Sequence, residues 1–278
     1  MYYIDLILLK IIPFALAILL IMFIFWKFNH KVKIKYKTFL KKGFAPRRGN
    51  FGVYCYDGKQ GKGKTYSIVE YLIDNKNDIT IFCNIANITN INYFHFTGFN
   101  ELLKLKKIID YNYKDYEDLK AFIYEQFKDE NRTIQLFELL KDCYENGKQI
   151  VFVYDEIFTE FEKKSKLDKD VIDFLCQMRK RKIIFLTTAQ EWAEIPLTFR
   201  RFCRYEIRCN MINFLGIGLL FKEFNDAENM KWSDEQQEHV APLLETTLTH
   251  CRKEIANSYD TFLRISSVGV EAPTGEKK

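Results

Sequence analysis

The feature that most constrains this chain is the segment Gly58–Thr65, which reads GKQGKGKT. It matches the pattern G-x-x-x-x-G-K-[ST] in full, and the glycines of that pattern let successive backbone N–H groups turn inward around phosphate groups. In such a loop Lys64 reaches the β- and γ-phosphates, and the Thr65 hydroxyl ligates Mg²⁺. We expect a nucleotide to be bound by the segment and the residue after it, namely Gly58, Lys59, Gln60, Gly61, Lys62, Gly63, Lys64, Thr65 and Tyr66.

The residues around this loop supply the structural context that the motif requires. A β-prone run occupies residues 51–56, apolar residues at helical spacing follow the loop, and a second apolar run, ITIFCN, occupies residues 79–84. Together they predict a βαβ unit. The helix that begins near Gly63 would present its positive N-terminal end to the phosphates. We therefore predict a phosphate-binding site rather than a plain turn rich in glycine and lysine.

Another apolar run, IVFVY at residues 150–154, ends in two acidic residues. A continuous apolar run is typical of a parallel strand that is covered on both faces. Asp155 is placed to hold the Mg²⁺ shell, and Glu156 to orient and deprotonate an attacking water. An acidic pair can also simply end a strand in solvent, but the phosphate loop upstream favours the catalytic interpretation. The two motifs predict ATP and Mg²⁺ as the ligands and hydrolysis as the reaction.

Polar residues after a third apolar run extend the predicted site. The run at residues 182–188 ends at Ala189 and Gln190, so Gln190 would emerge at the same sheet edge as Asp155. It is a candidate to sense the γ-phosphate or position the water, and a strand cap is the alternative. Arg200 and Arg201 follow, and either is a candidate arginine finger for a neighbouring subunit. A solvated basic pair is the other interpretation.

A basic run, Arg179–Lys182, precedes that third strand. Its cations suit contacts with DNA phosphates, and they equally suit the C-terminal end of a helix. Both interpretations remain open, because the net charge of +5 is mild and does not by itself indicate nucleic acid.

The N-terminal region predicts a membrane anchor within residues 1–27. The run Leu6–Trp26, LILLKIIPFALAILLIMFIFW, contains Lys10 as its only charge, and ~20 apolar residues are enough to cross the hydrocarbon core. Many lysines and arginines follow it in residues 27–48, which places the bulk of the chain in the cytoplasm. The alternating basic linker, residues 28–50, predicts an extended segment, with lipid or nucleic-acid contacts as further interpretations.

The cysteines and histidines do not form a recognisable metal or disulfide pattern. The seven cysteines are scattered and contain no Cys-x-x-Cys pair, and the four histidines are far apart. This distribution predicts a reducing compartment and no zinc site.

The remaining organisation follows from length and periodicity. A chain of 278 residues is long enough for one substantial α/β domain and an appendage. We assign residues 51–224 to an α/β domain with a mostly parallel sheet, residues 100–147 to a helical insertion, and residues 225–278 to a C-terminal extension ending in a loose tail.

These features together resemble the zonula occludens toxin-like family, which includes the filamentous-phage assembly ATPases, within the FtsK–HerA group of DNA-pumping motors. The resemblance spans Gly52–Arg208 and rests on GKQGKGKT, Asn84–Ile85, VFVYDE, QMRKRK and Gln190. It implies a RecA-like fold, a homo-oligomer such as a hexamer, and DNA or a DNA–protein particle as cargo. In the toxin-like proteins the membrane helix usually follows the ATPase domain, whereas here it precedes it, as in FtsK-like proteins.

Two other functions are compatible with a phosphate loop at a membrane. One is a nucleotide-dependent switch or scaffold with little turnover, which would not need Glu156. The other is a membrane-bound nucleotide kinase, whose lid would have to lie within residues 100–147.

Overall fold

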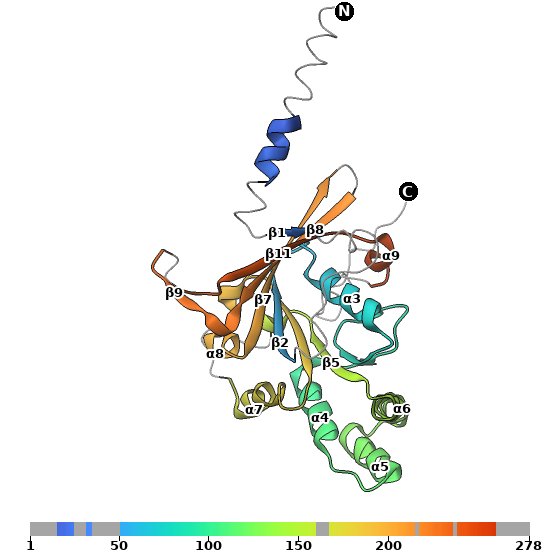
Figure 1. The fold of residues 1–278 in the computed structure, drawn as a ribbon. Coiled ribbons are helices and arrows are strands. Elements are labelled where there is room, and N and C mark those ends of the chain that lie inside the picture. The colour runs from blue at the N-terminus through green and yellow to red at the C-terminus, as the bar shows by residue number, and fades with distance from the viewer. Residues whose placement is uncertain are drawn as a thin grey trace, which may run out of the picture.

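A nine-stranded β-sheet forms the centre of the computed structural model (Figure 1), which describes residues 16–24, 32–34, 51–159, 167–214, 217–235 and 238–259. The strand order is β1-β11-β8-β7-β2-β6-β5-β3-β4. The strands from β7 to β4 in this order run parallel to one another: β2 (Gly52–Asp57), β3 (Ile79–Cys83), β4 (Phe94–His95), β5 (Gln149–Tyr154), β6 (Ile184–Ala189) and β7 (Cys203–Phe214). The predicted α/β class with a mostly parallel sheet is therefore confirmed.

The other edge of the sheet is antiparallel. Strand β8 (Ile217–Asp226) pairs antiparallel with β7, β11 (Leu243–His250) pairs antiparallel with β8, and β1 (Val32–Ile34) adds parallel to β11. A separate hairpin joins β9 (Lys231–Ser233) and β10 (Glu238–Val240).

Helices cover both faces of the parallel strands. Helix α3 (Lys64–Asn75) packs through Ile68, Val69 and Leu72 on the face that contains Val151 and Val153. Helices α4 (Gly98–Asp110) and α7 (Lys169–Gln177) pack on the face that contains Phe152. Successive residues of β5 thus enter opposite cores, which is why its sequence is apolar throughout.

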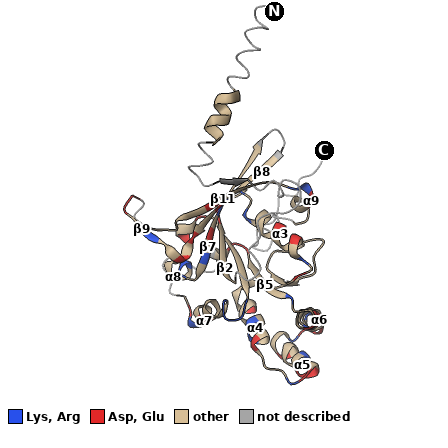
Figure 2. Ribbon diagram, in the orientation of Figure 1, with Lys and Arg blue, Asp and Glu red and all other residues tan. Residues whose placement is uncertain are grey.

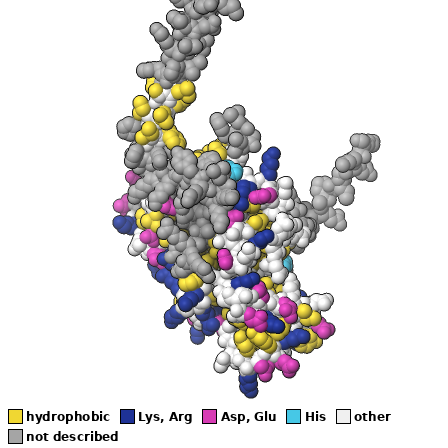
Figure 3. Space-filling view, turned by 45° about the vertical axis from the view of Figure 1, so that its right-hand side comes forward, with side chains coloured by type: hydrophobic (Ala, Val, Ile, Leu, Met, Phe, Trp, Pro, Cys, Tyr) yellow, Lys and Arg dark blue, Asp and Glu magenta, His cyan; other side chains and the backbone are white. Residues whose placement is uncertain are grey.

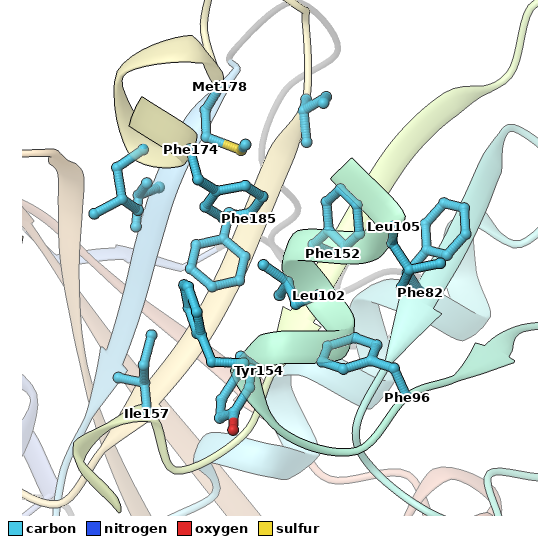
Figure 4. Packing of buried hydrophobic residues seen from close by; sticks show 14 of the residues in the cluster. Phe82, Phe96, Leu102, Leu105, Phe152, Tyr154, Ile157, Phe174, Met178 and Phe185 are labelled. Atoms are coloured by element: carbon cyan, nitrogen blue, oxygen red, sulfur yellow. The ribbon is translucent and has the colours of Figure 1, made fainter. Parts of the chain in front are cut away.

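The second of these cores is rich in aromatic rings (Figure 4). Phe174 of α7 contacts Phe152 and Phe185 edge-on, with ring centroids 5.8 and 5.4 Å apart. Leu102 and Leu105 of α4 lie beside these rings. Such edge-on contacts add a favourable electrostatic term to the burial of apolar surface.

The segment between β4 and β5 is helical, as the periodicity predicted. It contains α4, α5 (Tyr116–Phe127) and α6 (Glu130–Asn146), which lie together at one end of the molecule (Figure 1). Asp115 and Asp129 cap α5 and α6 by accepting hydrogen bonds from backbone N–H groups, which satisfies donors that the first turn leaves unpaired.

The described part of the C-terminal extension shares the central sheet. The expected boundary between residues 224 and 225 falls inside β8, and β11 pairs with β8 along its length. After β11, α9 (Lys253–Ala256) packs against α3. The sequence of Leu243–His250, LLETTLTH, is mostly polar and contains no long apolar run, so it does not by itself predict a strand of the main sheet. The predicted tail, residues 274–278, lies outside the described residues.

Part of the predicted anchor is described as a helix, at residues 16–24, which projects from the sheet (Figure 1). Its large apolar side chains are exposed: Leu16, Ile18, Leu19, Leu20, Ile21, Met22, Phe23 and Ile24. Figure 3 shows hydrophobic side chains on the visible face of this helix. Among the helices that the structure describes, none has both the length and the apolar character needed to cross a bilayer. The flanking residues 6–15 and 25–26 lie outside the described ranges, so the anchor stays a prediction. Strand β1 confirms the extended conformation predicted for one part of the linker.

Candidate functional site

The loop Gly58–Gly63 connects β2 to α3 and relies on glycine at three positions. Gly58, Gly61 and Gly63 have φ values of 139°, 74° and 88°, a range that side chains with a Cβ rarely adopt. At Gly58 a Cβ would also lie 2.6 Å from the Cys209 carbonyl oxygen. No side chain caps the first turn of α3, so no capping side chain competes with an anion for the N–H groups at this helix start.

Lys64 is turned back over this loop. Its side chain is buried, and Nζ donates hydrogen bonds to the carbonyl oxygens of Gly58 at 2.5 Å and Lys59 at 3.1 Å. The ammonium group is thereby placed inside the curve of the loop, where phosphate oxygens would replace the carbonyls as its partners. Lys59, Gln60 and Gly61 form the exposed tip.

Tyr66 is placed differently from the rest of the predicted nucleotide-binding set. Its side chain is buried, and its hydroxyl accepts a hydrogen bond from the Arg252 backbone N–H at 2.7 Å. The side chain therefore faces the C-terminal segment, and only the backbone N–H of Tyr66 belongs to the helix start that faces the loop.

The structure brings the two predicted metal ligands together. The Thr65 hydroxyl oxygen lies 3.3 Å from each carboxylate oxygen of Asp155, although 90 residues separate them in sequence. Hydroxyl and carboxylate oxygens are the hard ligands that Mg²⁺ prefers, usually with several waters retained. Thr65 and Asp155 therefore fit a Mg²⁺ ion as its protein ligands.

Two uncharged side chains position this acidic strand end. The Asn84 amide accepts from the Asp155 backbone N–H at 2.6 Å and donates to the Asp155 carbonyl at 3.1 Å. On the other side, the Thr188 hydroxyl donates to Asp155 Oδ1 at 2.6 Å, and the Glu156 backbone N–H donates to that hydroxyl at 2.7 Å. Sequence reasoning gave neither Asn84 nor Thr188 a role. Their signal is that each is a polar residue near the carboxyl end of a strand next to β5.

Glu156 adopts a backbone conformation that is uncommon for its residue type. Its φ is 58°, in the left-handed region, and its side chain is half-buried. Such a conformation costs about 1 kcal/mol or more, and it persists where surrounding contacts determine it. The candidate base is therefore held by the local structure rather than by the preference of its own backbone.

Gln190 lies beside the loop, directly after β6, the strand next to β2. Its backbone carbonyl accepts from the Gly58 N–H at 3.3 Å, and its side chain is exposed. It lines a cavity of about 380 Å³ together with Lys59, Lys62, Trp192 and Arg208. The structure thus places Gln190 next to the phosphate loop, and its proposed sensing role stays a prediction.

The same cavity borders a buried carboxylate that the sequence did not single out. Burial raises the pKa of Asp57 to about 6, and the nearby Arg208 guanidinium opposes this rise. Arg208 Nε lies 3.7 Å from Asp57 Oδ2, and Arg208 Nη2 donates to Glu206 Oε1 at 3.0 Å. One arginine therefore serves two buried acids at the rim of the cavity.

The two candidate finger arginines lie at the end of α8 (Leu197–Arg200) and occupy different environments. Arg200 is buried, with its guanidinium 5.8 Å from the centre of the Trp192 ring. Arg201 is exposed. Neither lines the cavity beside the loop. A finger acts on a neighbouring subunit, so Arg201 is the better placed of the two, and the role stays a prediction.

The basic run after α7 is partly neutralised within the chain. Arg179 forms an ion pair with Glu228, and Arg181 forms one with Asp110. Lys180 and Lys182 are exposed, and Figure 2 marks basic residues around α7 and α8. Only part of this run is thus available for phosphate contacts. All seven cysteines are free in the structure.

The chain matches the family model described as Zonular occludens toxin (Zot) over residues 52–260. No curated protein matches it.

Solved structures with a similar arrangement include the N-terminal domain of zonular occludens toxin from Neisseria meningitidis. It has 14% identity and a TM-score of 0.40, and the match covers 75% of this chain and 98% of that one. The genome packaging NTPase B204 from Sulfolobus turreted icosahedral virus 2, in complex with ATP-gammaS, has 13% identity and a TM-score of 0.37, with 69% and 98% covered. Because the family model covers more than half of the sequence, the chain belongs to the Zonular occludens toxin (Zot) family.

Proposed function

We propose that this chain is a membrane-anchored, Mg²⁺-dependent ATPase whose oligomer uses hydrolysis to drive DNA, or a DNA–protein particle, at or through the membrane. The observation that carries the ATPase part is the convergence of Thr65, Asp155 and Glu156. Thr65 lies in the first turn of α3, at the end of a complete phosphate-binding motif, and its hydroxyl oxygen is 3.3 Å from each Asp155 carboxylate oxygen. Glu156 follows Asp155 directly in sequence.

The side chains divide the chemistry among them. The loop N–H groups and Lys64 bind the phosphates and offset the charge that develops on the transferred group. Thr65 and Asp155 would hold Mg²⁺, which supplies further charge neutralisation when bound. Glu156 accepts a proton from the water that attacks the γ-phosphorus, while the bond to the β,γ-bridging oxygen breaks and ADP leaves.

The nucleoside half of ATP has room beside the loop. The cavity lined by Lys59, Lys62 and Trp192 has a volume of about 380 Å³, within the usual range of small-molecule sites. No residue of the helical insertion, 100–147, lines it. This arrangement favours a nucleotide that enters from solvent over one enclosed by a lid made of that insertion.

The membrane part of the proposal is supported by the apolar run Leu6–Trp26 and by the exposed apolar side chains of residues 16–24. The basic residues that follow would keep the ATPase domain in the cytoplasm. DNA as cargo is supported by family membership. Extraction of cell membranes at high pH tests the anchor, because an integral protein stays in the pellet and a peripheral one is released.

Phosphate release by the purified full-length chain, with detergent present, tests the ATPase. We expect Lys64→Ala to abolish hydrolysis and weaken ATP binding, and Glu156→Gln to abolish hydrolysis while ATP binding remains. Lys76→Ala is the matched control, because Lys76 is exposed at the other end of α3. The ATPase proposal fails if the wild type does not hydrolyse ATP, or if hydrolysis survives both substitutions.

Adding single- or double-stranded DNA to the same assay separates the motor from its rivals. A motor predicts that DNA increases the rate of hydrolysis. A switch or scaffold would bind ATP with little turnover in either condition. A nucleotide kinase would transfer the γ-phosphate to a nucleoside monophosphate instead of to water.

A further inference from the structure

Thr188 is in contact with both acidic residues of the site at once. It lies on β6 with its side chain fully buried. Its hydroxyl is 2.6 Å from Asp155 Oδ1 and 2.7 Å from the Glu156 backbone nitrogen. Both are short hydrogen bonds, and the one to the carboxylate is of the stronger, charge-assisted kind.

The direction of these bonds is determined by the chemistry of the partners. The Glu156 N–H can only donate, so the Thr188 oxygen accepts from it. The single hydroxyl proton is then directed to the Asp155 carboxylate, which can only accept when ionised. The hydroxyl thus has one orientation, and it links the carboxylate of one residue to the backbone of the next.

Each bond has a consequence for the predicted chemistry. The bond to Asp155 holds its carboxylate in the rotation that keeps both oxygens 3.3 Å from the Thr65 hydroxyl. The bond to the Glu156 N–H supports a backbone with φ of 58°. If this support is lost, that backbone can relax toward a more common conformation and move the Glu156 carboxylate away from its working position.

We propose that Thr188 is a positioning residue that sets the metal-ligating carboxylate of Asp155 and the backbone of the base Glu156 through one hydroxyl group. The inference rests on the proposed ATPase function for the role of these two acids. It goes beyond that function in naming the side chain that couples them. Thr188 itself touches neither phosphate nor water in this scheme.

The neighbouring residue provides a matched control. Thr187 is also fully buried on β6, and its hydroxyl donates to the Tyr154 backbone carbonyl at 2.8 Å. Thr187→Val and Thr188→Val therefore each remove one buried hydroxyl of the same type from the same strand. They differ in the hydrogen bond that is lost. Thr188→Val loses the bond to the Asp155 carboxylate, and Thr187→Val loses a bond to a backbone carbonyl.

The test measures ATP hydrolysis and its Mg²⁺ dependence in the full-length chain. For Thr188→Val we expect kcat to fall about 100-fold, because small misplacements of reacting groups can slow a reaction by about this factor. The Mg²⁺ concentration for half-maximal activity should rise about 10-fold, as is common when a side chain that orients a metal ligand is lost. Thr188→Ser keeps the hydroxyl and should restore both quantities. Thr187→Val should change neither.

Several outcomes would overturn the proposal. It is wrong if Thr188→Val behaves like Thr187→Val, or if Thr188→Ser is as impaired as Thr188→Val. Thermal unfolding of each variant reports whether it is folded, and Thr188→Ala replaces the valine variant if that one does not fold.

The failure of the ATPase proposal can be told apart from the failure of this one. If the wild type does not hydrolyse ATP, the ATPase proposal fails. The affinity for a non-hydrolysable ATP analogue, with and without Mg²⁺, is then measured in place of the hydrolysis rate. In that case we expect Mg²⁺ to increase the affinity for the ATP analogue in the wild type and in Thr187→Val. The increase should be smaller in Thr188→Val. An equal increase in both variants overturns the positioning role.

Discussion

Lys222 Nζ lies 2.9 Å from Glu70 Oε2, and the two side chains are only 1% and 3% exposed. Glu70 belongs to α3, the helix that starts in the phosphate loop, and Lys222 belongs to β8. Arg252 extends the pair, because its Nη2 lies 2.8 Å from Asp74 Oδ1 and 3.7 Å from Glu70 Oε1. Buried charges thus connect the helix behind the loop to the antiparallel edge of the sheet.

Removing one partner of this ion pair should destabilise the fold strongly. Lys222→Met leaves the Glu70 carboxylate buried without its ammonium partner, and we expect a loss of about 3–5 kcal/mol in the free energy of unfolding. The double variant Lys222→Met with Glu70→Met should recover most of this loss, since it leaves no uncompensated charge. Urea unfolding of the two single variants and the double variant checks this. Strictly additive losses would show that the two side chains do not interact.

The loop glycines should differ in their tolerance of alanine. At Gly61 an added Cβ meets no atom within 4 Å, so Gly61→Ala incurs only the cost of a left-handed backbone, about 1–2 kcal/mol. At Gly58 the Cβ would lie 2.6 Å from a backbone oxygen of Cys209, and the loop must move. We expect Gly58→Ala to weaken ATP binding at least 10-fold more than Gly61→Ala. Fluorescence titration with a labelled nucleotide measures the difference, and equal affinities would contradict it.

Arg132 should act as the main polar anchor of the helical insertion. Its guanidinium makes two parallel bonds to Glu101, at 2.7 and 3.0 Å, and its centre lies 4.6 Å from the Phe127 ring centroid. A lysine cannot reproduce the planar fork or the stacking, so Arg132→Lys should cost about 2 kcal/mol. Lys106→Ala, which removes the pair with Asp110 four residues away on α4, should cost about 0.5 kcal/mol or less. Urea unfolding compares the two, and similar losses would exclude the anchor role.

The parts of the structure that the sequence predicts well are those with a local cause. Strands β2, β5 and β6 are continuous apolar runs because both of their faces are covered, and the loop Gly58–Thr65 carries its own motif. From these residues the sequence predicts the fold class, the phosphate loop and the position of Asp155 in the same site. Residues 243–250 were not predicted as a strand because they are mostly polar, reading LLETTLTH, and contain no apolar run.

The contacts around Asp155 could not be predicted in the same way. Thr188 reaches Asp155 because β6 lies next to β5, and Asn84 reaches it because β3 lies on the other side. Strand order is a property of the tertiary fold and is not visible in the sequence. A threonine within an apolar run therefore indicates a β-strand but not a contact with Asp155. Asp57 was missed for a related reason. Its burial depends on β6 and β7, which pair with β2 on either side.

The raised pKa of Asp57 makes a prediction about stability and pH. Its pKa rises from 3.8 to about 6 in the folded chain because the carboxyl is buried. Between these values the folded state keeps a proton that the unfolded state has released, so this group makes stability fall as the pH rises from about 4 to 6. Asp57→Asn cannot ionise and should lack this fall. The variant should therefore gain on the wild type by up to about 3 kcal/mol at pH 7 and by little at pH 4.

Urea unfolding of wild type and Asp57→Asn at pH 4, 5, 6 and 7 measures this difference, and the pH dependence of all other groups cancels in the comparison. Arg208→Gln provides the opposite change. It removes the cation that opposes the rise in the pKa of Asp57, so the fall in stability should continue above pH 6. Parallel curves for all three proteins would show that Asp57 ionises as easily in the folded chain as in the unfolded one, and that its burial does not control its charge.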